Sequence, residues 1–207
     1  MTTRRAIASF TEIATVHIEL KGSEPPIWRR VEVPTSITLK VVHDIVQVTM
    51  GWFDYHLWEI VIDGQTYSLP MDEDWATAPR KPASRTRLRE VIAPGTTRIE
   101  YTYDFGDNWE HILVVSDVRA GDPGAPYPRY VAGERDCPPE DCGGITGFYD
   151  MLEARADPEH PEHAAICEWL DGYDPNELDV FPIEGALSRI AARRNAAAKR
   201  ILKSVND

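Results

Sequence analysis

The chain has 207 residues, enough for one full hydrophobic core and a smaller appended region. Hydrophobic residues make up 43% and charged residues 27%, a composition typical of globular proteins that excludes wholesale disorder. The net charge of −12 disfavours nucleic-acid binding, because such binding draws much of its affinity from neutralised phosphates.

We expect a cytoplasmic protein without a membrane partner. No stretch approaches the ~18 consecutive apolar residues that a membrane-spanning helix needs. The first residues lack the long apolar run of a signal peptide. The cysteine count is 3, and an odd number would leave one thiol outside any disulfide framework, which favours a reducing compartment.

The first half of the chain alternates between strand and helix patterns. Period-2 alternation predicts strands, and the apolar spacing from Leu39 to Met50, with Thr38 before it and Gly51 after it, predicts one amphipathic helix. Asp63-Gly64 is a strong hairpin signal, because this pair tolerates a tight turn. The predicted elements are strands 14–20 and 27–33, helix 39–50, strands 57–62 and 65–69, a loop over 72–82, a helical turn at 86–91, and strands 98–105 and 109–118.

This order of hairpin, helix, hairpin, short helix and strand is that of a ubiquitin-like β-grasp fold. The segment 85–91 before the last core strand also resembles the corresponding link in ubiquitin. We therefore predict an α+β protein with a β-grasp core over residues 12–118. This is a fold-level analogy and carries no activity.

After residue 118 the composition changes. Residues 119–145 are rich in proline and glycine and contain two cysteines, so we predict a long loop without regular structure. Helices are predicted near 146–156, 161–170 and 183–203, which gives a helical extension, 146–207, packed on the core.

Three ordered motifs then resemble a known family, the ORF-three family first named from a root-inducing plasmid. They are Pro25–Arg30 (PPIWRR), Tyr103–His111 (YDFGDNWEH) and Cys137–Gly144 (CPPEDCGG), the last followed by Gly147-Phe148-Tyr149. The resemblance covers roughly residues 12–185. It implies an α+β fold of the β-grasp kind and no established activity, and members are sometimes labelled as resolvase-like passengers of mobile elements. The chain supplies no serine recombinase domain to support that label.

The Tyr103–His111 motif predicts a hairpin with a possible dyad. If its loop is Asp107-Asn108, then Asp104 lies opposite His111, within side-chain contact. A carboxylate beside an imidazole raises the histidine pKa and fixes its tautomer, as a general base or a metal ligand requires. The alternative is a hydrogen-bonded pair that only pins the register of the hairpin.

The spacing of Cys137 and Cys142 permits a divalent metal such as zinc, with Cys167 or His111 completing the ligand set. The family often carries one more cysteine, where Tyr130 stands here, and this weakens a cysteine-only site. The alternatives are a redox-sensitive pair, or a structural motif in which Glu140 and Asp141 accept backbone hydrogen bonds.

Three functions remain open at this point. The first is a non-enzymatic binding module with a protein partner, linked to mobile elements by the resemblance. The second is a metal-dependent hydrolase or nuclease-like enzyme that uses a carboxylate and histidine cluster. Its candidate residues are Asp104, Asp107, His111, Glu140 and Asp141. The third is DNA association through the basic helix that contains Arg193 and Arg194, although segment 134–184 is strongly acidic.

Overall fold

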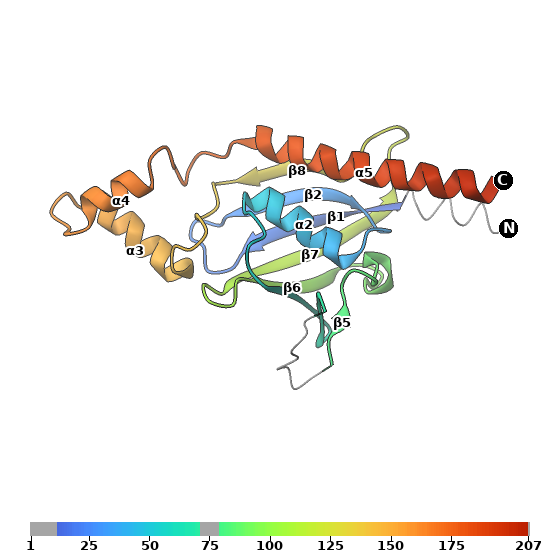
Figure 1. Cartoon of the computed structure of the whole chain (residues 1–207), viewed down its shortest axis with the longest axis horizontal. Helices are drawn as coiled ribbons and strands as arrows, with labels where there is room; N and C mark the ends of the chain where they lie inside the picture. The colour runs from blue at the N-terminus through green and yellow to red at the C-terminus, as the bar shows by residue number, and fades with distance from the viewer. Residues whose placement is uncertain (1–11, 71–78, 207) are drawn as a thin grey trace.

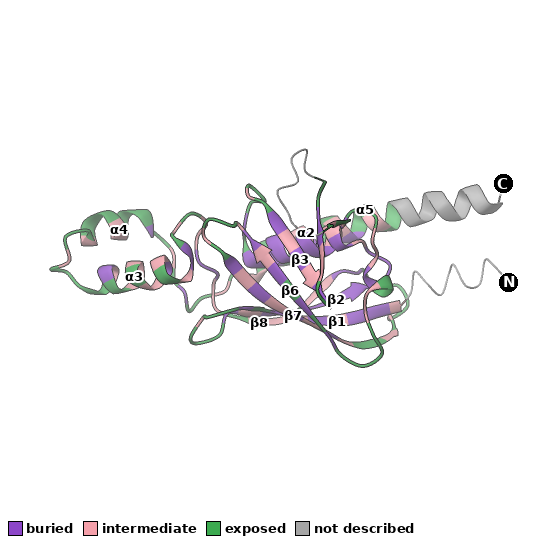
Figure 2. Ribbon diagram, turned by 90° about the horizontal axis from the view of Figure 1, so that it is seen from below, coloured by how far each residue is buried: buried purple, intermediate pink, exposed green. Residues whose placement is uncertain are grey.

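The computed structural model describes residues 12–70 and 79–206, with side chains up to residue 196. One large sheet forms the body of the molecule, and helices α2 (Leu39–Met50) and α5 (Val180–Asn206) lie on the same face of it (Figures 1 and 2). Helices α3 (Gly144–Ala156) and α4 (His163–Trp169) form a hairpin that projects from one end. None of the helices in these residues has the length and apolarity needed to cross a bilayer. The α+β class predicted from the sequence is confirmed.

The sheet has eight strands in the order β5-β4-β3-β6-β7-β1-β2-β8. All neighbouring strands are antiparallel except β4 and β5, which are parallel. The strands are β1 (Glu12–Leu20), β2 (Trp28–Pro34), β3 (Trp58–Ile62), β4 (Gln65–Ser68), β5 (Lys81–Pro82), β6 (Thr97–Tyr103), β7 (Trp109–Ala120) and β8 (Arg129–Glu134). A short 3-10 helix, η1 (Leu88–Glu90), precedes β6.

The β-grasp core is not confirmed. In ubiquitin the first and last core strands are adjacent and parallel, whereas here β7 lies between β6 and β1 and is antiparallel to both. The order of elements along the chain was predicted well, but a strand order across the sheet depends on long-range pairing that local periodicity does not report.

The prediction that residues 119–145 form a loop without regular structure is wrong in part. The segment contains β8, an edge strand that pairs with β2. The prolines and glycines of this segment lie mostly on either side of β8, and residues 129–134 contain no proline and only Gly133. Composition averaged over the whole segment therefore hid a short strand. Residues 71–78 of the predicted 72–82 loop are outside the described residues, while Lys81–Pro82 form β5.

Helix α2 begins and ends where the sequence predicts. The Thr38 hydroxyl accepts a hydrogen bond from the backbone N–H of Val41, and Gly51 ends the helix at φ 84°, a conformation that glycine adopts without strain. Its apolar face packs on the sheet through Val42, Ile45 and Val46. A fully buried aliphatic side chain contributes about 1.5–3 kcal/mol, so this contact holds the end of α2 firmly over the sheet.

Candidate functional site

The turn between β6 and β7 and the loop that precedes α3 come together, although about thirty residues separate them. The backbone N–H of Gly143 donates to Asp107 Oδ2 at 3.1 Å. Gly144 has φ 69°, and a Cβ atom added there would lie 2.3 Å from the backbone oxygen of Asp107. Only glycine permits this close approach. Gly144 therefore allows the Cys137–Gly144 motif to pack directly against the Tyr103–His111 motif.

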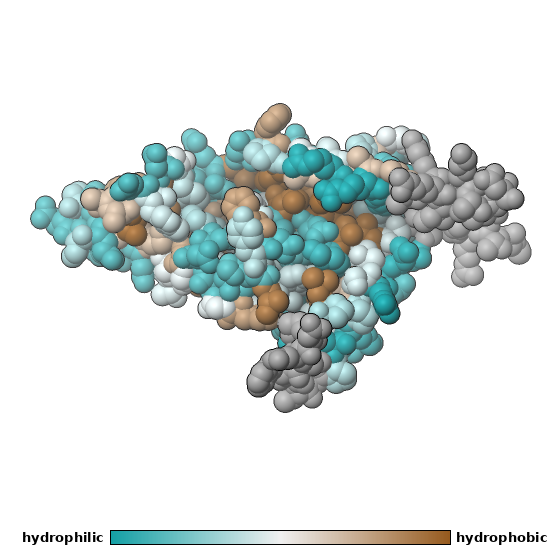
Figure 3. Space-filling model, viewed as in Figure 1, coloured by the Kyte–Doolittle hydropathy of each residue, from teal (hydrophilic) through white to brown (hydrophobic). Residues whose placement is uncertain are grey.

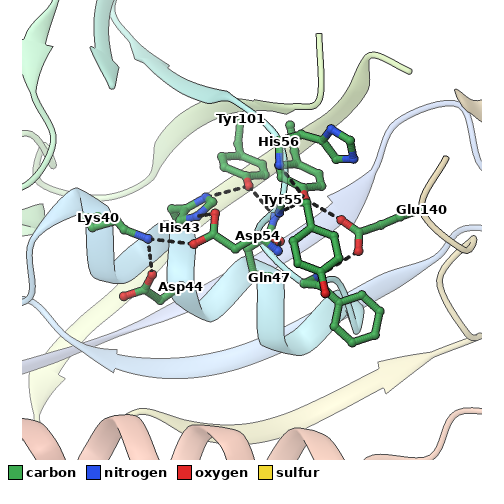
Figure 4. A network of polar contacts seen from close by, with 11 residues as sticks. Lys40, His43, Asp44, Gln47, Asp54, Tyr55, His56, Tyr101 and Glu140 are labelled. Atoms are coloured by element: carbon green, nitrogen blue, oxygen red, sulfur yellow. Dashed lines mark hydrogen bonds and ion pairs between the residues drawn. The ribbon is translucent and has the colours of Figure 1, made fainter. Parts of the chain in front are cut away.

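A third segment, the loop over residues 51–57, contacts the β6–β7 turn and the loop before α3. Glu140, in the loop before α3, makes the connecting bonds. One oxygen of the Glu140 carboxylate accepts the backbone N–H of Phe53 at 2.9 Å, and the other accepts a short hydrogen bond from the Tyr103 hydroxyl (Figure 4). The Tyr103 oxygen in turn accepts the backbone N–H of Tyr55 at 3.0 Å. Burial, together with the bond to Glu140, raises the pKa of Tyr103, which keeps it a neutral donor.

The same three segments bring together one imidazole and two carboxylates. His56 Nε2 lies 3.2 Å from Asp141 Oδ1 and 3.7 Å from Asp104 Oδ2, although neither contact is aligned as a hydrogen bond. The three candidate ligand atoms lie within 4.8 Å of one another. Such a group has the atom types and spacing that can hold a divalent metal ion.

A second polar cluster surrounds the buried His43 of α2. Its Nδ1 lies 2.9 Å from the Tyr101 hydroxyl and its Nε2 lies 2.8 Å from Asp54 Oδ1. Burial and the nearby Lys40 lower the pKa of His43 to about 4, so the neutral ring donates to Asp54 and accepts from Tyr101. The Lys40 ammonium binds both Asp44, at 2.7 Å, and Asp54, at 3.1 Å (Figure 4).

This second cluster is satisfied by its own members. Gln47 donates to the Tyr101 hydroxyl at 3.0 Å and accepts the backbone N–H of Asp54 at 3.0 Å. Both ring nitrogens of His43 are already bonded, and the Lys40 ammonium contacts both carboxylates. The cluster therefore fixes the loop after α2 to the sheet, and the ring nitrogens of His43 and both carboxylate oxygens of Asp54 are already engaged within it.

The predicted pairing of Asp104 with His111 is wrong. In the β6–β7 ladder His111 pairs with Tyr101 and Trp109 pairs with Tyr103, so the connection is a five-residue turn over 104–108. Asp104 and Asn108 adopt positive φ angles of 53° and 54° and close this longer turn. The sequence prediction assumed a two-residue loop, and a change of loop length shifts every cross-strand partner.

The histidine itself lies in the core. His111 is almost fully buried, and its Nδ1 lies 3.1 Å from the backbone oxygen of Trp109. Burial lowers the pKa of His111 to about 3, so the ring is neutral and donates from Nδ1. Its Nε2 has no hydrogen-bond partner among the described residues, and the ring packs against Trp52 and Tyr101. His111 is thus separated from the carboxylates with which it was grouped.

The three cysteines are free thiols. Cys137 is buried, and burial raises its pKa; burial likewise raises the pKa of Cys142 to about 12. Cys167 lies in α4, where its sulfur is 3.7 Å from His163 Nε2. In the part of the chain that the structure describes, no group of three possible metal ligands contains a cysteine. The structure thus does not assemble the ligand set suggested by the sequence.

A groove of about 820 Å³ runs beside these segments, between the end of α2, the loop over 136–141 and the start of α5. Its floor includes Trp52, whose indole N–H donates to the backbone oxygen of Pro138 at 2.9 Å. Three aromatic side chains line it while remaining largely exposed: Phe53 at 69%, Tyr55 at 75% and Trp169 at 50%. Apolar side chains gather between α2 and α5 on this face (Figure 3).

The basic stretch of α5 is only partly available to a ligand. Arg193 is exposed, whereas Arg194 is partly buried and donates to the Ser36 hydroxyl at 3.3 Å. Burial lowers the pKa of Arg194. The later basic residues of α5 lie where side chains are not described.

The residue that sequence reasoning missed is His56. Asp104 and Asp141 were both predicted as candidate catalytic residues, but His56 was not among the predicted site residues. Its two carboxylate partners lie 48 and 85 positions away. A signal was present in that His56 follows a turn containing Asp54, but nothing local connects it to the other two motifs.

The fold and the site define an α+β protein in which three loops converge at one end of a single large sheet, and two of these loops carry sequence motifs. The chain belongs to the family described as "Plasmid pRiA4b ORF-3-like protein", which it matches over residues 12–181. The resemblance inferred from the three motifs is confirmed.

Two relatives illustrate this membership. The chain is 33% identical over 190 residues to "Uncharacterized protein y4hQ" of Sinorhizobium fredii, covering 91% of this chain and 97% of that protein. It is also similar to the crystal structure of a protein of unknown function, MM3350 from Methanosarcina mazei Go1. That match has a TM-score of 0.76 and 33% identity, and it covers 82% of this chain and 96% of the other.

Proposed function

We propose that this protein is a binding module that docks a basic, apolar peptide segment of a protein partner in the groove beside α2 and α5. The observation that carries the proposal is the exposure of Phe53, Tyr55 and Trp169 around one preformed groove. Large aromatic side chains are enriched in the buried centres of protein interfaces, and an exposed apolar patch of this kind marks an interaction surface. Phe53 and Tyr55 also stack on each other, with ring centroids 5.6 Å apart.

The charges around the groove favour a basic partner. Four acidic side chains line it, and the two arginines that line it are Arg189 and the fully buried Arg29. The acidic side chains are Asp136, Glu140, Asp141 and Asp179. Complementary charge steers association and suppresses wrong partners, so lysine or arginine next to an apolar anchor fits this surface.

The walls of the groove are held in place before any partner arrives. Glu140 fixes Phe53 through its backbone N–H, and Trp52 holds Pro138. A preorganised site loses less conformational entropy on binding than a loop that must order itself. Both oxygens of the Glu140 carboxylate accept hydrogen bonds, from Phe53 and from Tyr103, which supports a docking role for Glu140 over activation of a hydrolytic water.

The test is a selection from a randomised peptide library displayed on phage, with the full chain as bait. We expect enriched peptides that combine Leu, Phe or Trp with Lys or Arg, and whose binding falls in a Trp169→Ser variant. Acidic peptides, or no enrichment over a bait-free control, would contradict the proposal. Equal recovery on wild type and Trp169→Ser would place binding elsewhere and contradict it as well.

A further inference from the structure

The group formed by His56, Asp104 and Asp141 differs from the other polar clusters in one respect. Its two carboxylates have no lysine or arginine partner: among the ion pairs of residues 12–70 and 79–196, Asp104 and Asp141 contact only His56. In the cluster around His43, by contrast, Lys40 lies between the two carboxylates. Two carboxylates this close repel each other unless a cation lies between them.

The ligand atoms of this group are also uncommitted. Asp104 uses Oδ1 to accept the backbone N–H of Gly106 at 2.9 Å, which orients the carboxylate and leaves Oδ2 free. His56 Nε2 is shielded from solvent and has no hydrogen-bond partner in the described part of the chain, although it lies close to both carboxylates. The His56 side chain is 28% exposed, but its Nε2 is shielded, and a metal ion is one partner that would satisfy this nitrogen together with the two oxygens.

The backbone presents these ligands from three separate segments. Asp104 belongs to the β6–β7 turn, Asp141 to the loop before α3, and His56 to the loop after α2. Asp104 and Asp141 have positive φ angles of 53° and 60°. Such angles aim an aspartate side chain from a tight turn, and aspartate and asparagine tolerate them better than most residues.

We propose that His56 Nε2, Asp104 Oδ2 and Asp141 Oδ1 bind a divalent transition-metal ion of the Zn²⁺ type. One imidazole nitrogen with two carboxylate oxygens is a ligand set that zinc accepts, whereas calcium takes oxygen ligands alone. The ion ties the loop after α2 to the two loops that carry the second and third family motifs, and it fixes Asp141, which lines the groove. This inference does not depend on peptide docking.

The experiment measures metal binding by the full chain, first stripped with a chelator and then titrated with ZnCl₂ or CaCl₂ in a calorimeter. We expect one zinc ion per chain and no saturable calcium binding. The variants Asp104→Asn and Asp141→Asn keep side-chain shape and tolerate positive φ, so they preserve the turns. Each should weaken zinc binding by more than the 10- to 100-fold that loss of an outer-shell partner costs.

Two matched controls define the site. Asp63→Asn alters another aspartate at positive φ, in the β3–β4 turn, and Asp44→Asn alters the cluster around His43. Both should bind zinc as wild type does. Absence of zinc binding by wild type, unchanged affinity in both cluster variants, or loss confined to Asp44→Asn would overturn the proposal. Circular dichroism of each variant verifies that a loss is not caused by unfolding.

Discussion

At the scale of single residues, His43 and His111 are both held as neutral imidazoles inside the protein. The pKa of His43 is lowered to about 4 and that of His111 to about 3, in each case mainly by burial. In the unfolded chain a histidine has a pKa near 6.5. Below that pH the unfolded state therefore binds protons that the folded state does not bind. The stability that these two residues contribute is complete above pH 6.5 and is lost as the pH falls toward their folded pKa values.

We predict that the free energy of unfolding falls by about 1.5 kcal/mol for each of the two histidines between pH 6.5 and pH 5. Urea unfolding at several pH values measures this slope. A His111→Phe variant, which keeps an aromatic ring in the core, should lose the part of the slope that comes from that residue. A variant whose slope equals that of wild type would show that His111 does not remain neutral on folding.

Glu140 is the second residue with a local and measurable effect. Its carboxylate accepts hydrogen bonds from the backbone of Phe53 and from the Tyr103 hydroxyl. Hydrogen bonds to a charged group contribute about 1.5–3 kcal/mol, so Glu140→Ala should lower the free energy of unfolding by about 2 kcal/mol.

A double-mutant cycle with Tyr103→Phe separates the shared bond from other effects of each substitution. We expect a coupling energy of at least about 0.5 kcal/mol, because the two side chains are in direct contact. Additive effects of the two substitutions would mean that this bond does not stabilise the fold.

At the scale of elements, the start of α3 requires a glycine at position 144, because the backbone of Asp107 lies against it. Gly144 faces the backbone oxygen of Asp107, and neither backbone segment can give way as a flexible side chain would. We predict that Gly144→Ala destabilises the fold by about 2 kcal/mol more than Gly124→Ala, in chemical denaturation. Gly124 also has positive φ but has nothing within 4 Å of an added Cβ, so it is the matched control for backbone strain. Equal losses would mean that the contact with Asp107 relaxes.

The elements themselves were largely predictable from the sequence, because each rests on a local pattern. Helix α2 was located to the residue by its apolar spacing, Thr38 and Gly51, and the Asp63-Gly64 turn appeared between β3 and β4 as expected. The position of β7 between β6 and β1 was not predictable, since two strands of similar alternation can pair in either order. The same limit applied to the β6–β7 turn, whose five residues moved His111 away from Asp104.

At the scale of the whole molecule, three loops far apart in the chain meet at one end of one sheet. The sequence identified two of them as site candidates, and Asp104 and Asp141 do meet. The sequence did not identify His56 as their partner. It also did not predict the groove, because Phe53, Tyr55 and Trp169 come together only once α2, α4 and α5 are arranged around it. An exposed aromatic side chain looks like a core residue until its surroundings are known.

The central claim, docking of a basic apolar segment in the groove, is tested most directly by the affinity of one library-selected peptide for a set of variants. Fluorescence anisotropy gives the dissociation constant for wild type, for Trp169→Ser and for the double variant Phe53→Ser with Tyr55→Ser. The control is Phe105→Ser, which removes an exposed aromatic side chain that does not line the groove.

We predict that each groove variant weakens binding by at least about 2 kcal/mol, roughly 30-fold, as the loss of an aromatic anchor does. The control should bind as wild type does, and affinity should fall as salt is added, because charge complementarity contributes. The same affinity for wild type and both groove variants, or a loss of equal size in the Phe105→Ser control, would contradict the account.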